Sequence, residues 1–181
     1  MANKLLEHKN YAQVELNNCA FRRDGRIVAD CIATMVIQNG MLALVDRVKK
    51  TAKPATSVPT ANEQAVLVYN AEHSPASTFN RLCDYVSQAG DGIRGGLLSV
   101  GDVFTTNAVM YDDTKYVNIS KIADALKAGT PVYAIGGDGT SAGFWLITNA
   151  VTGTPTVTGI VKEVTTTPDG YPALKIVITK A

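Results

Sequence analysis

The sequence has no excess of charge of either sign and no long apolar run. It contains 17 Lys and Arg against 16 Asp and Glu in 181 residues, a formal net charge of +1 at pH 7. A nucleic-acid or acidic-membrane partner usually leaves a strongly basic surface, which this balance does not indicate. The longest apolar runs, such as residues 41–45, fall far short of the ~20 residues of a membrane-spanning helix. We therefore expect no nucleic-acid partner, no membrane span and, since the chain turns polar at Glu7, no signal peptide.

Cysteine and histidine are also scarce. The three cysteines, Cys19, Cys31 and Cys83, are odd in number and widely spaced. This usage predicts reduced, buried thiols and assembly in a reducing cytoplasm rather than a disulfide framework. The two histidines, His8 and His73, lie in polar contexts without a second ligand at helical or strand spacing. We therefore expect no histidine-based metal site, no serine or cysteine triad and no cofactor.

Short β-patterned runs separated by glycine and proline turns dominate what is present, above all in the last third. This regular spacing predicts a mainly β fold, a small β-barrel or sandwich. Two segments instead have helical character: residues 77–86, with apolar residues on one face, and residues 120–127, which follow a Ser N-cap. The fold class is thus mainly β with one or two short helices. The C-terminal runs that carry this prediction are residues 128–135, 144–148, 157–164 and 173–178.

The N-terminal region, residues 1–50, reads as rich in β-hairpins. An Asp-Gly pair within residues 21–32 and an Asn-Gly pair within residues 35–44 are typical hairpin turns. Residues 51–63 are polar, contain two prolines and lack periodicity, which predicts a linker or long surface loop. We place a domain boundary there, with a β-rich, barrel-like domain at 64–181. The lysines near this loop could contact an acidic neighbour, although a solvated loop is favoured.

Several motifs resemble catalytic or cofactor-binding signatures without their usual context. Residues 137–142 match the dinucleotide fingerprint, but the strand-like sequence after them favours a hairpin loop over the helix that the fingerprint needs. A small hydrolase could use Asp102, Asp112 or Asp113 with Cys83 or a histidine, yet no acid, base and orienting group fall into a recognisable arrangement. No run matches an EF-hand loop. We expect no catalytic residues, no metal site and no enzyme.

Four runs in the C-terminal half carry a family resemblance. They are residues 98–106 (LSVGDVFTT), 126–133 (LKAGTPVY), 159–161 (GIV) and 169–172 (DGYP). Together they resemble small accessory proteins on the heads of tailed bacteriophages, the head fibre and capsid decoration proteins. In that resemblance the first run opens a strand, the second forms a turn where the chain enters the barrel, and the third is a late strand.

The resemblance implies a non-catalytic structural virion protein that binds the outer capsid surface as a homotrimer. Its partner would be the major capsid protein, and it would be located on the capsid surface of the virion after assembly in the host cytoplasm. Homotrimers generally place apolar residues near the axis. Candidates for these contacts are Tyr133, Phe144 and Trp145. The N-terminal segment is a candidate capsid-docking arm, with a frayed terminus as the alternative; the arm would comprise Asn3, Lys4, Leu5, Leu6 and Tyr11.

A second hypothesis is a carbohydrate-binding module that attaches its bearer to a host surface glycan. Such a module stacks sugar rings on exposed aromatic side chains. The aromatic platforms available in this sequence are Trp145, Tyr111, Tyr116 and Tyr171.

Overall fold

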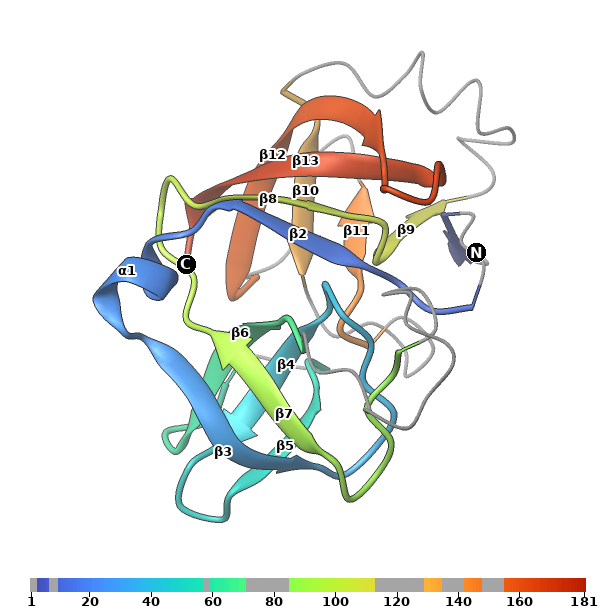
Figure 1. The fold of residues 1–181 in the computed structure, drawn as a ribbon. Coiled ribbons are helices and arrows are strands. Elements are labelled where there is room, and N and C mark those ends of the chain that lie inside the picture. Colours follow the sequence, from blue (N-terminus) through green and yellow to red (C-terminus); the bar gives the residue numbers. More distant parts are fainter. Residues whose placement is uncertain are drawn as a thin grey trace.

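The computed structural model describes residues 3–6, 10–56, 59–70, 85–112, 129–134, 142–147 and 155–181. The fold is mainly β, as predicted, and contains a closed five-stranded barrel. An eight-stranded sheet lies against this barrel, above it in the view of Figure 1.

The eight-stranded sheet is assembled from both ends of the chain. Its longest pairing joins β12 to β13 in antiparallel register, from Thr158 opposite Lys180 to Thr166 opposite Pro172. Gly170, with φ of 84°, lies in the turn between these two strands. In spatial order the strands are β1 (Asn3–Leu5), β9 (Val109–Asp112), β11 (Trp145–Ile147), β10 (Pro131–Ala134), β12 (Val157–Thr166), β13 (Pro172–Lys180), β8 (Val103–Thr106) and β2 (Val14–Asn18).

The barrel is an insertion between β2 and β8, which are neighbours in the sheet. A short helix, α1 (Ala20–Asp24), joins β2 to the first barrel strand. The strands in order around the barrel are β3 (Ile27–Ala33), β5 (Thr51–Pro54), β4 (Leu42–Asp46), β6 (Glu63–Val68) and β7 (Gly92–Gly96).

Strand β4 explains how barrel and sheet hold together. All five of its residues are buried. Leu42 and Leu44 belong to a cluster shared with the sheet, whereas the alternate residues Ala43 and Val45 belong to the barrel cluster. Since successive side chains of a strand point to opposite faces, a strand buried on both faces reads as a continuous apolar run.

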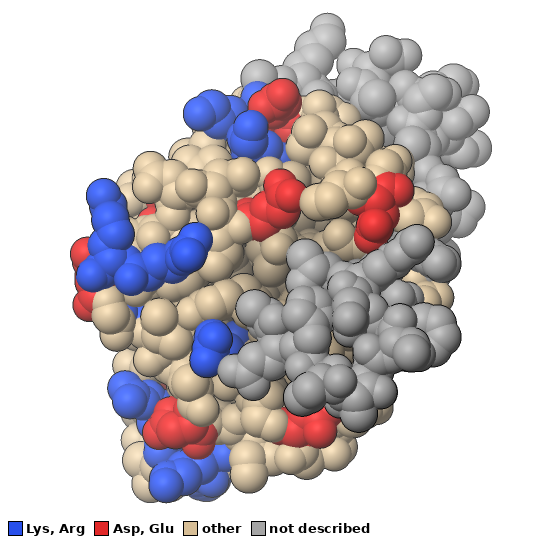
Figure 2. Space-filling view, viewed as in Figure 1, with Lys and Arg blue, Asp and Glu red and all other residues tan. Residues whose placement is uncertain are grey.

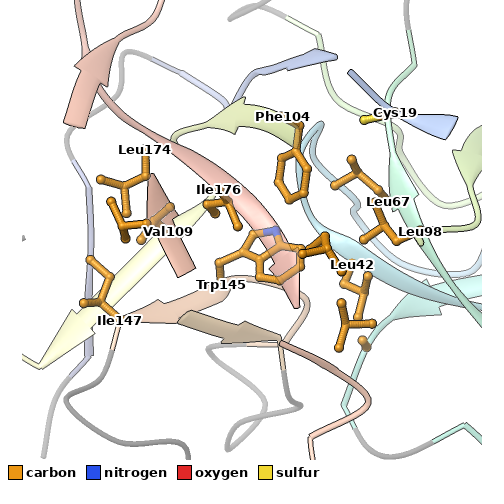
Figure 3. Packing of buried hydrophobic residues seen from close by; sticks show 14 of the residues in the cluster. Cys19, Leu42, Leu67, Leu98, Phe104, Val109, Trp145, Ile147, Leu174 and Ile176 are labelled. Carbon is orange, nitrogen blue, oxygen red and sulfur yellow. The ribbon is translucent and has the colours of Figure 1, made fainter. Parts of the chain in front are cut away.

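Trp145 lies at the centre of the shared cluster. Its side chain is fully buried, and its ring lies 5.3 Å from that of Phe104. The indole N–H donates a hydrogen bond of 2.9 Å to the carbonyl of Gly40, in the turn before β4. Figure 3 shows Trp145 among Phe104 and Ile176 of the sheet and Leu42 of the barrel. Burial is therefore combined with a satisfied polar group, as a core tryptophan requires.

Both hairpins predicted near the N-terminus differ from the structure. The Asp-Gly pair ends helix α1, whose left-handed C-cap is Gly25 with φ of 67°. The Asn-Gly pair does form a turn: Met41 N–H donates to the Gln38 carbonyl, and Gly40 has φ of 83°. Strand β4 follows this turn, but on its other side Ile37 makes only an isolated bridge to Ser87. Glycine at positive φ suits helix caps and hairpins alike, so the local sequence did not distinguish them.

The predicted boundary at residues 51–63 does not separate the barrel from the sheet. Residues 51–54 form β5, and strands before this segment pair with strands after it, β4 with β6 and β3 with β7. Pro54 is the last residue of β5, where a missing N–H is tolerated. The strands predicted in the last third are present at 131–134, 145–147, 157–166 and 172–180. Both predicted helices, 77–86 and 120–127, fall mainly or wholly outside the described residues.

Candidate functional site

The most distinctive surface is the part of the barrel farthest from the eight-stranded sheet. The end of β3 and the β4–β5 turn lie at the lower end of the molecule in Figure 1, whereas the chain after β3 returns to the sheet, where Gln38 Oε1 accepts the N–H of Ala12. We call the end of β3 and the β4–β5 turn the distal face. It carries two exposed large apolar side chains, Ile32 and Val48, and the Ile32 N–H donates to the Lys50 carbonyl of the turn. Ile32 is exposed because its neighbours Cys31 and Ala33 point into the barrel.

The β4–β5 turn, residues 47–50, projects Val48 into solvent. The Val48 side chain is 80% exposed. The carboxylate Oδ1 of Asp46 accepts the backbone N–H groups of Val48 at 3.0 Å and of Lys49 at 2.9 Å. Lys50 closes the turn at φ of 54°, a left-handed conformation that favours glycine. The carboxylate therefore fixes the turn in one conformation.

Basic side chains surround Val48. Arg47, Lys49 and Lys50 are all exposed. Lys49 Nζ lies 3.7 Å from Asp46 Oδ2, and no ion pair is present for Arg47 or Lys50 among the described residues. Figure 2 shows Lys and Arg atoms at the lower end of the molecule, with Asp and Glu atoms directly beside them. The distal face thus carries charges of both signs beside the exposed Val48.

A hollow of about 150 Å³ adjoins this face. Glu63 Oε1 lies 2.7 Å from Lys53 Nζ, and Glu63 Oε2 accepts the N–H and hydroxyl of Thr60. The hydrogen bond from Lys53, followed by those from Thr60, lowers the pKa of Glu63 to about 2. Both carboxylate oxygens of Glu63 are held by these partners, so the carboxylate is not available as a general acid or base. The hollow is lined by Thr34, Leu44, Asp46, Lys49, Thr51, Ala52, Lys53 and Glu63.

The residues predicted for a trimer interface lie apart from the distal face. Trp145 is fully buried within its own chain and Phe144 is 8% exposed. Tyr133 is in β10, but its side chain lies outside the described residues. Trp145 therefore contributes to the core of this chain and has no surface left for a second copy to cover.

The predicted N-terminal docking arm is joined to the sheet. Residues 3–5 form β1, which pairs antiparallel with β9. Leu6 continues the connection, since its N–H donates to the Val109 carbonyl at 2.9 Å and its side chain is buried. Tyr11 is partly buried. These hydrogen bonds fix Asn3 to Leu6 as an edge of the sheet, not as a detached arm.

Asp102, considered as a hydrolase residue, has a structural environment. Its buried carboxylate accepts the N–H of Ala20 at 2.7 Å and the N–H of Ser99 at 2.8 Å. It therefore ties the start of α1 to the turn that opens β8. Asp112 is the last residue of β9, and Asp113 lies outside the described residues.

The two described cysteines are buried and unpaired. Burial raises the pKa of Cys19 to about 12, and its thiol donates to the Val103 carbonyl at 3.3 Å. Burial also raises the pKa of Cys31. Both thiols are protonated at neutral pH and are poor nucleophiles. Cys83, His8 and His73 lie outside the described residues.

The dinucleotide-like motif lies almost wholly outside the described residues, since residues 137–141 are not described. Strands β10 and β11, on either side of it, pair antiparallel. Of the proposed glycan platforms, Trp145 and Tyr111 are buried and Tyr171 is partly exposed, while Tyr116 lies outside the described residues.

The lysines of the distal face are recognisable in the sequence, but its exposed apolar residues, Ile32 and Val48, are not. Which face of β3 is exposed depends on its pairing with β5 and β7, which no local pattern reveals.

Comparisons with known proteins give no relative for this chain. No protein-family model, no curated protein and no solved structure matches it. Within the described residues, no helix is long and apolar enough to cross a membrane. The same residues contain no group of three or more His, Cys, Asp or Glu side chains placed to hold a metal ion.

Proposed function

We propose that this chain is a non-catalytic structural protein of a tailed-bacteriophage virion that binds the outer capsid surface as a head fibre or decoration protein. The observation that carries the proposal is the placement of the four runs on which the resemblance rests. Gly101, with φ of 92°, and Asp102 lead into β8, and Gly129, with φ of 97°, leads into β10. Residues 159–161 lie in β12, and residues 169–172 lie in the turn after β12 and at the first residue of β13.

Turns and strand openings of this kind support a scaffold that acts by contact. One detail departs from the resemblance: the second run leads into the eight-stranded sheet, not into the closed barrel. The strongly exposed Val48 between the exposed Arg47 and Lys49 supports a contact role for the β4–β5 turn. The proposed partner is the major capsid protein.

A homotrimer is part of the proposal. Strands β1 and β2 are the two ends of the eight-stranded sheet, so each has an edge unpaired with another described strand. Oligomerisation covers such edges and places several contact surfaces on one shell, which multiplies weak affinities. Light scattering should give about three times the chain mass of 19.2 kDa, independent of concentration.

Co-sedimentation with capsid shells tests the function. The shells are assembled from the major capsid protein encoded in the same genome as this chain. We expect saturable binding to shells at a fixed ratio and no binding to free capsid subunits. Failure to sediment with shells, or the absence of a capsid gene from that genome, would contradict the proposal. Binding to host glycans instead would support the carbohydrate-binding alternative.

A further inference from the structure

We infer that Asn39 is a deamidation site that the fold keeps closed, so that opening of the turn at residues 38–41 makes unfolding irreversible. The inference concerns one side-chain amide and needs no partner, so it is independent of the proposed function. Asn39-Gly40 is the only Asn-Gly pair in the sequence. In an unfolded chain an asparagine before glycine is especially labile, because glycine has no Cβ to hinder attack by its own backbone nitrogen.

The reaction needs only water. The Gly40 backbone nitrogen forms a bond to the side-chain carbonyl carbon of Asn39, and the Asn39 amide nitrogen leaves as ammonia, which takes up the proton that the Gly40 nitrogen loses. Water then opens the cyclic imide at one of its two carbonyls and gives aspartate or isoaspartate at position 39. The environments of the attacking and the leaving nitrogen therefore decide the rate.

The fold holds both nitrogens in hydrogen bonds. The Gly40 N–H donates to the Val68 carbonyl at 2.8 Å, at the end of β6. Asn39 Nδ2 donates to the Asn70 carbonyl at 2.9 Å. The Val68 N–H adds a third bond, to the Met41 carbonyl at 2.9 Å. The Asn39 residue is only 3% exposed, so water for the second step is also kept away. Deamidation should therefore be slow in the folded protein.

The packing around Gly40 explains why the labile pair is present. Gly40 has φ of 83°, and a Cβ there would clash with Thr106 Oγ1 and lie 3.0 Å from the Gln13 carbonyl. The Trp145 indole N–H also donates to the Gly40 carbonyl. The close contact between barrel and sheet thus requires glycine after Asn39. Local opening of this contact would release the turn and expose the pair.

The product of the reaction does not fit the folded structure. An aspartate at position 39 would place a carboxylate oxygen against the Asn70 carbonyl, where Nδ2 now donates. Asn39 Oδ1 finds no hydrogen-bond donor among the described residues, so nothing there would compensate the charge. A buried, uncompensated charge is strongly unfavourable, and isoaspartate would in addition lengthen the main chain of the turn. Deamidated chains should therefore refold poorly, which makes the unfolding irreversible.

The first experiment compares the unaltered protein in buffer and in guanidinium chloride at the same mildly alkaline pH and temperature. Tryptic cleavage after Arg26 and Arg47 gives a peptide of residues 27–47 in which Asn39 is the only asparagine, and mass spectrometry detects conversion of its amide to a carboxylate. We expect conversion at least about tenfold faster in guanidinium chloride than in buffer. Equal rates, or no conversion in guanidinium chloride, would overturn the inference.

The second experiment tests the product with a matched pair of variants. Asn39→Asp reproduces the deamidated side chain, and Asn18→Asp makes the same change at an exposed position of β2. We expect Asn39→Asp to lower the melting temperature by about 5 °C or more, or to prevent folding, and Asn18→Asp to change it little. An Asn39→Asp variant that melts with the unaltered protein would show that deamidation does not make unfolding irreversible. The mass-spectrometric comparison uses the unaltered protein and does not depend on whether the variant folds.

Discussion

The barrel and the eight-stranded sheet use the same β geometry but present different surfaces. All six arginines of the chain lie between residues 22 and 94, the segment that contains α1 and the barrel. The strands of the sheet contain none. Among the residues that the structure describes, five of the seven exposed large hydrophobic residues also lie between β3 and β5 of the barrel segment. The two parts therefore differ in surface composition although both are built from β-strands.

The two parts nevertheless share one core. Leu42, Leu44 and Leu67 of the barrel pack in the same cluster as Trp145 and Phe104 of the sheet. The hydrogen bond from Trp145 to Gly40 crosses the same boundary. A barrel inserted between two neighbouring strands and packed in this way should unfold together with the sheet.

The largest effect should come from removing the tryptophan at this boundary. Trp145→Ala should lower the free energy of unfolding by about 3–5 kcal/mol, because it removes a buried aromatic side chain and leaves a cavity. Urea denaturation followed by far-UV circular dichroism measures the change. Val100→Ala is the matched control at an exposed site and should stay within about 0.5 kcal/mol. A loss below about 1 kcal/mol for Trp145→Ala would contradict a shared core.

Two glycines of β7 sharpen the comparison at the joint between α1 and the barrel. A Cβ at Gly96 would clash with the ring of Phe21, whereas a Cβ at Gly92 would meet nothing within 4 Å. Gly96→Ala should destabilise the protein by about 1–3 kcal/mol, because the buried ring must shift. Gly92→Ala should be neutral or slightly stabilising, since alanine restricts the unfolded chain. Thermal melts of the pair measure the contrast, and equal melting temperatures would disprove the close approach.

Elements that depend on local pattern could be predicted from the sequence. Strands β8, β12 and β13 follow alternating or turn-bounded runs, and the turn at Gly101-Asp102 precedes β8 as expected. Strand pairing between distant segments could not be predicted, since β3 pairs with β7 across about sixty residues and β5 occupies the predicted linker.

The candidate site was harder to predict than the fold. A strand pattern around Trp145 does not distinguish a core residue from an interface residue, because both positions are apolar. Ile32 is exposed because the barrel closes on the opposite side of β3. The basic turn was visible in the sequence, but its apolar neighbours were not recognisable as surface.

Asp102 provides a smaller test, of the carboxylate that joins α1 to the opening of β8. Asp102→Asn should cost about 1–2 kcal/mol, because the amide offers one acceptor oxygen for two backbone N–H groups and carries no charge. Asp30→Asn, at an exposed position on β3, is the control and should change little. Chemical denaturation distinguishes them. An Asp102→Asn variant as stable as the control would show that the two hydrogen bonds contribute little.

The smallest expected effect is on the pH dependence of stability. It comes from comparing one ion pair of the barrel with one ion pair of the sheet. Lys53 holds the pKa of Glu63 at about 2, below its ordinary 4.5, while the hydrogen bond from Lys175 lowers the pKa of Glu163. A depressed carboxyl pKa stabilises the fold above the ordinary value, and this stabilisation is lost as the pH falls from 4.5 toward about 2. Glu63→Gln should therefore flatten the loss of stability over this interval.

Glu163→Gln should flatten it less, because the Glu163 side chain is 55% exposed against 11% for Glu63 and solvent screens its pairing with Lys175. Melting temperatures of both variants, measured across the acidic range at low and high salt, compare the two. Salt should reduce the Glu163 effect first, since an exposed pair is screened more strongly than a sheltered one. A larger or more salt-resistant effect at Glu163 would reverse the comparison. It would show that the ion pair of the sheet stabilises the fold more than the ion pair of the barrel.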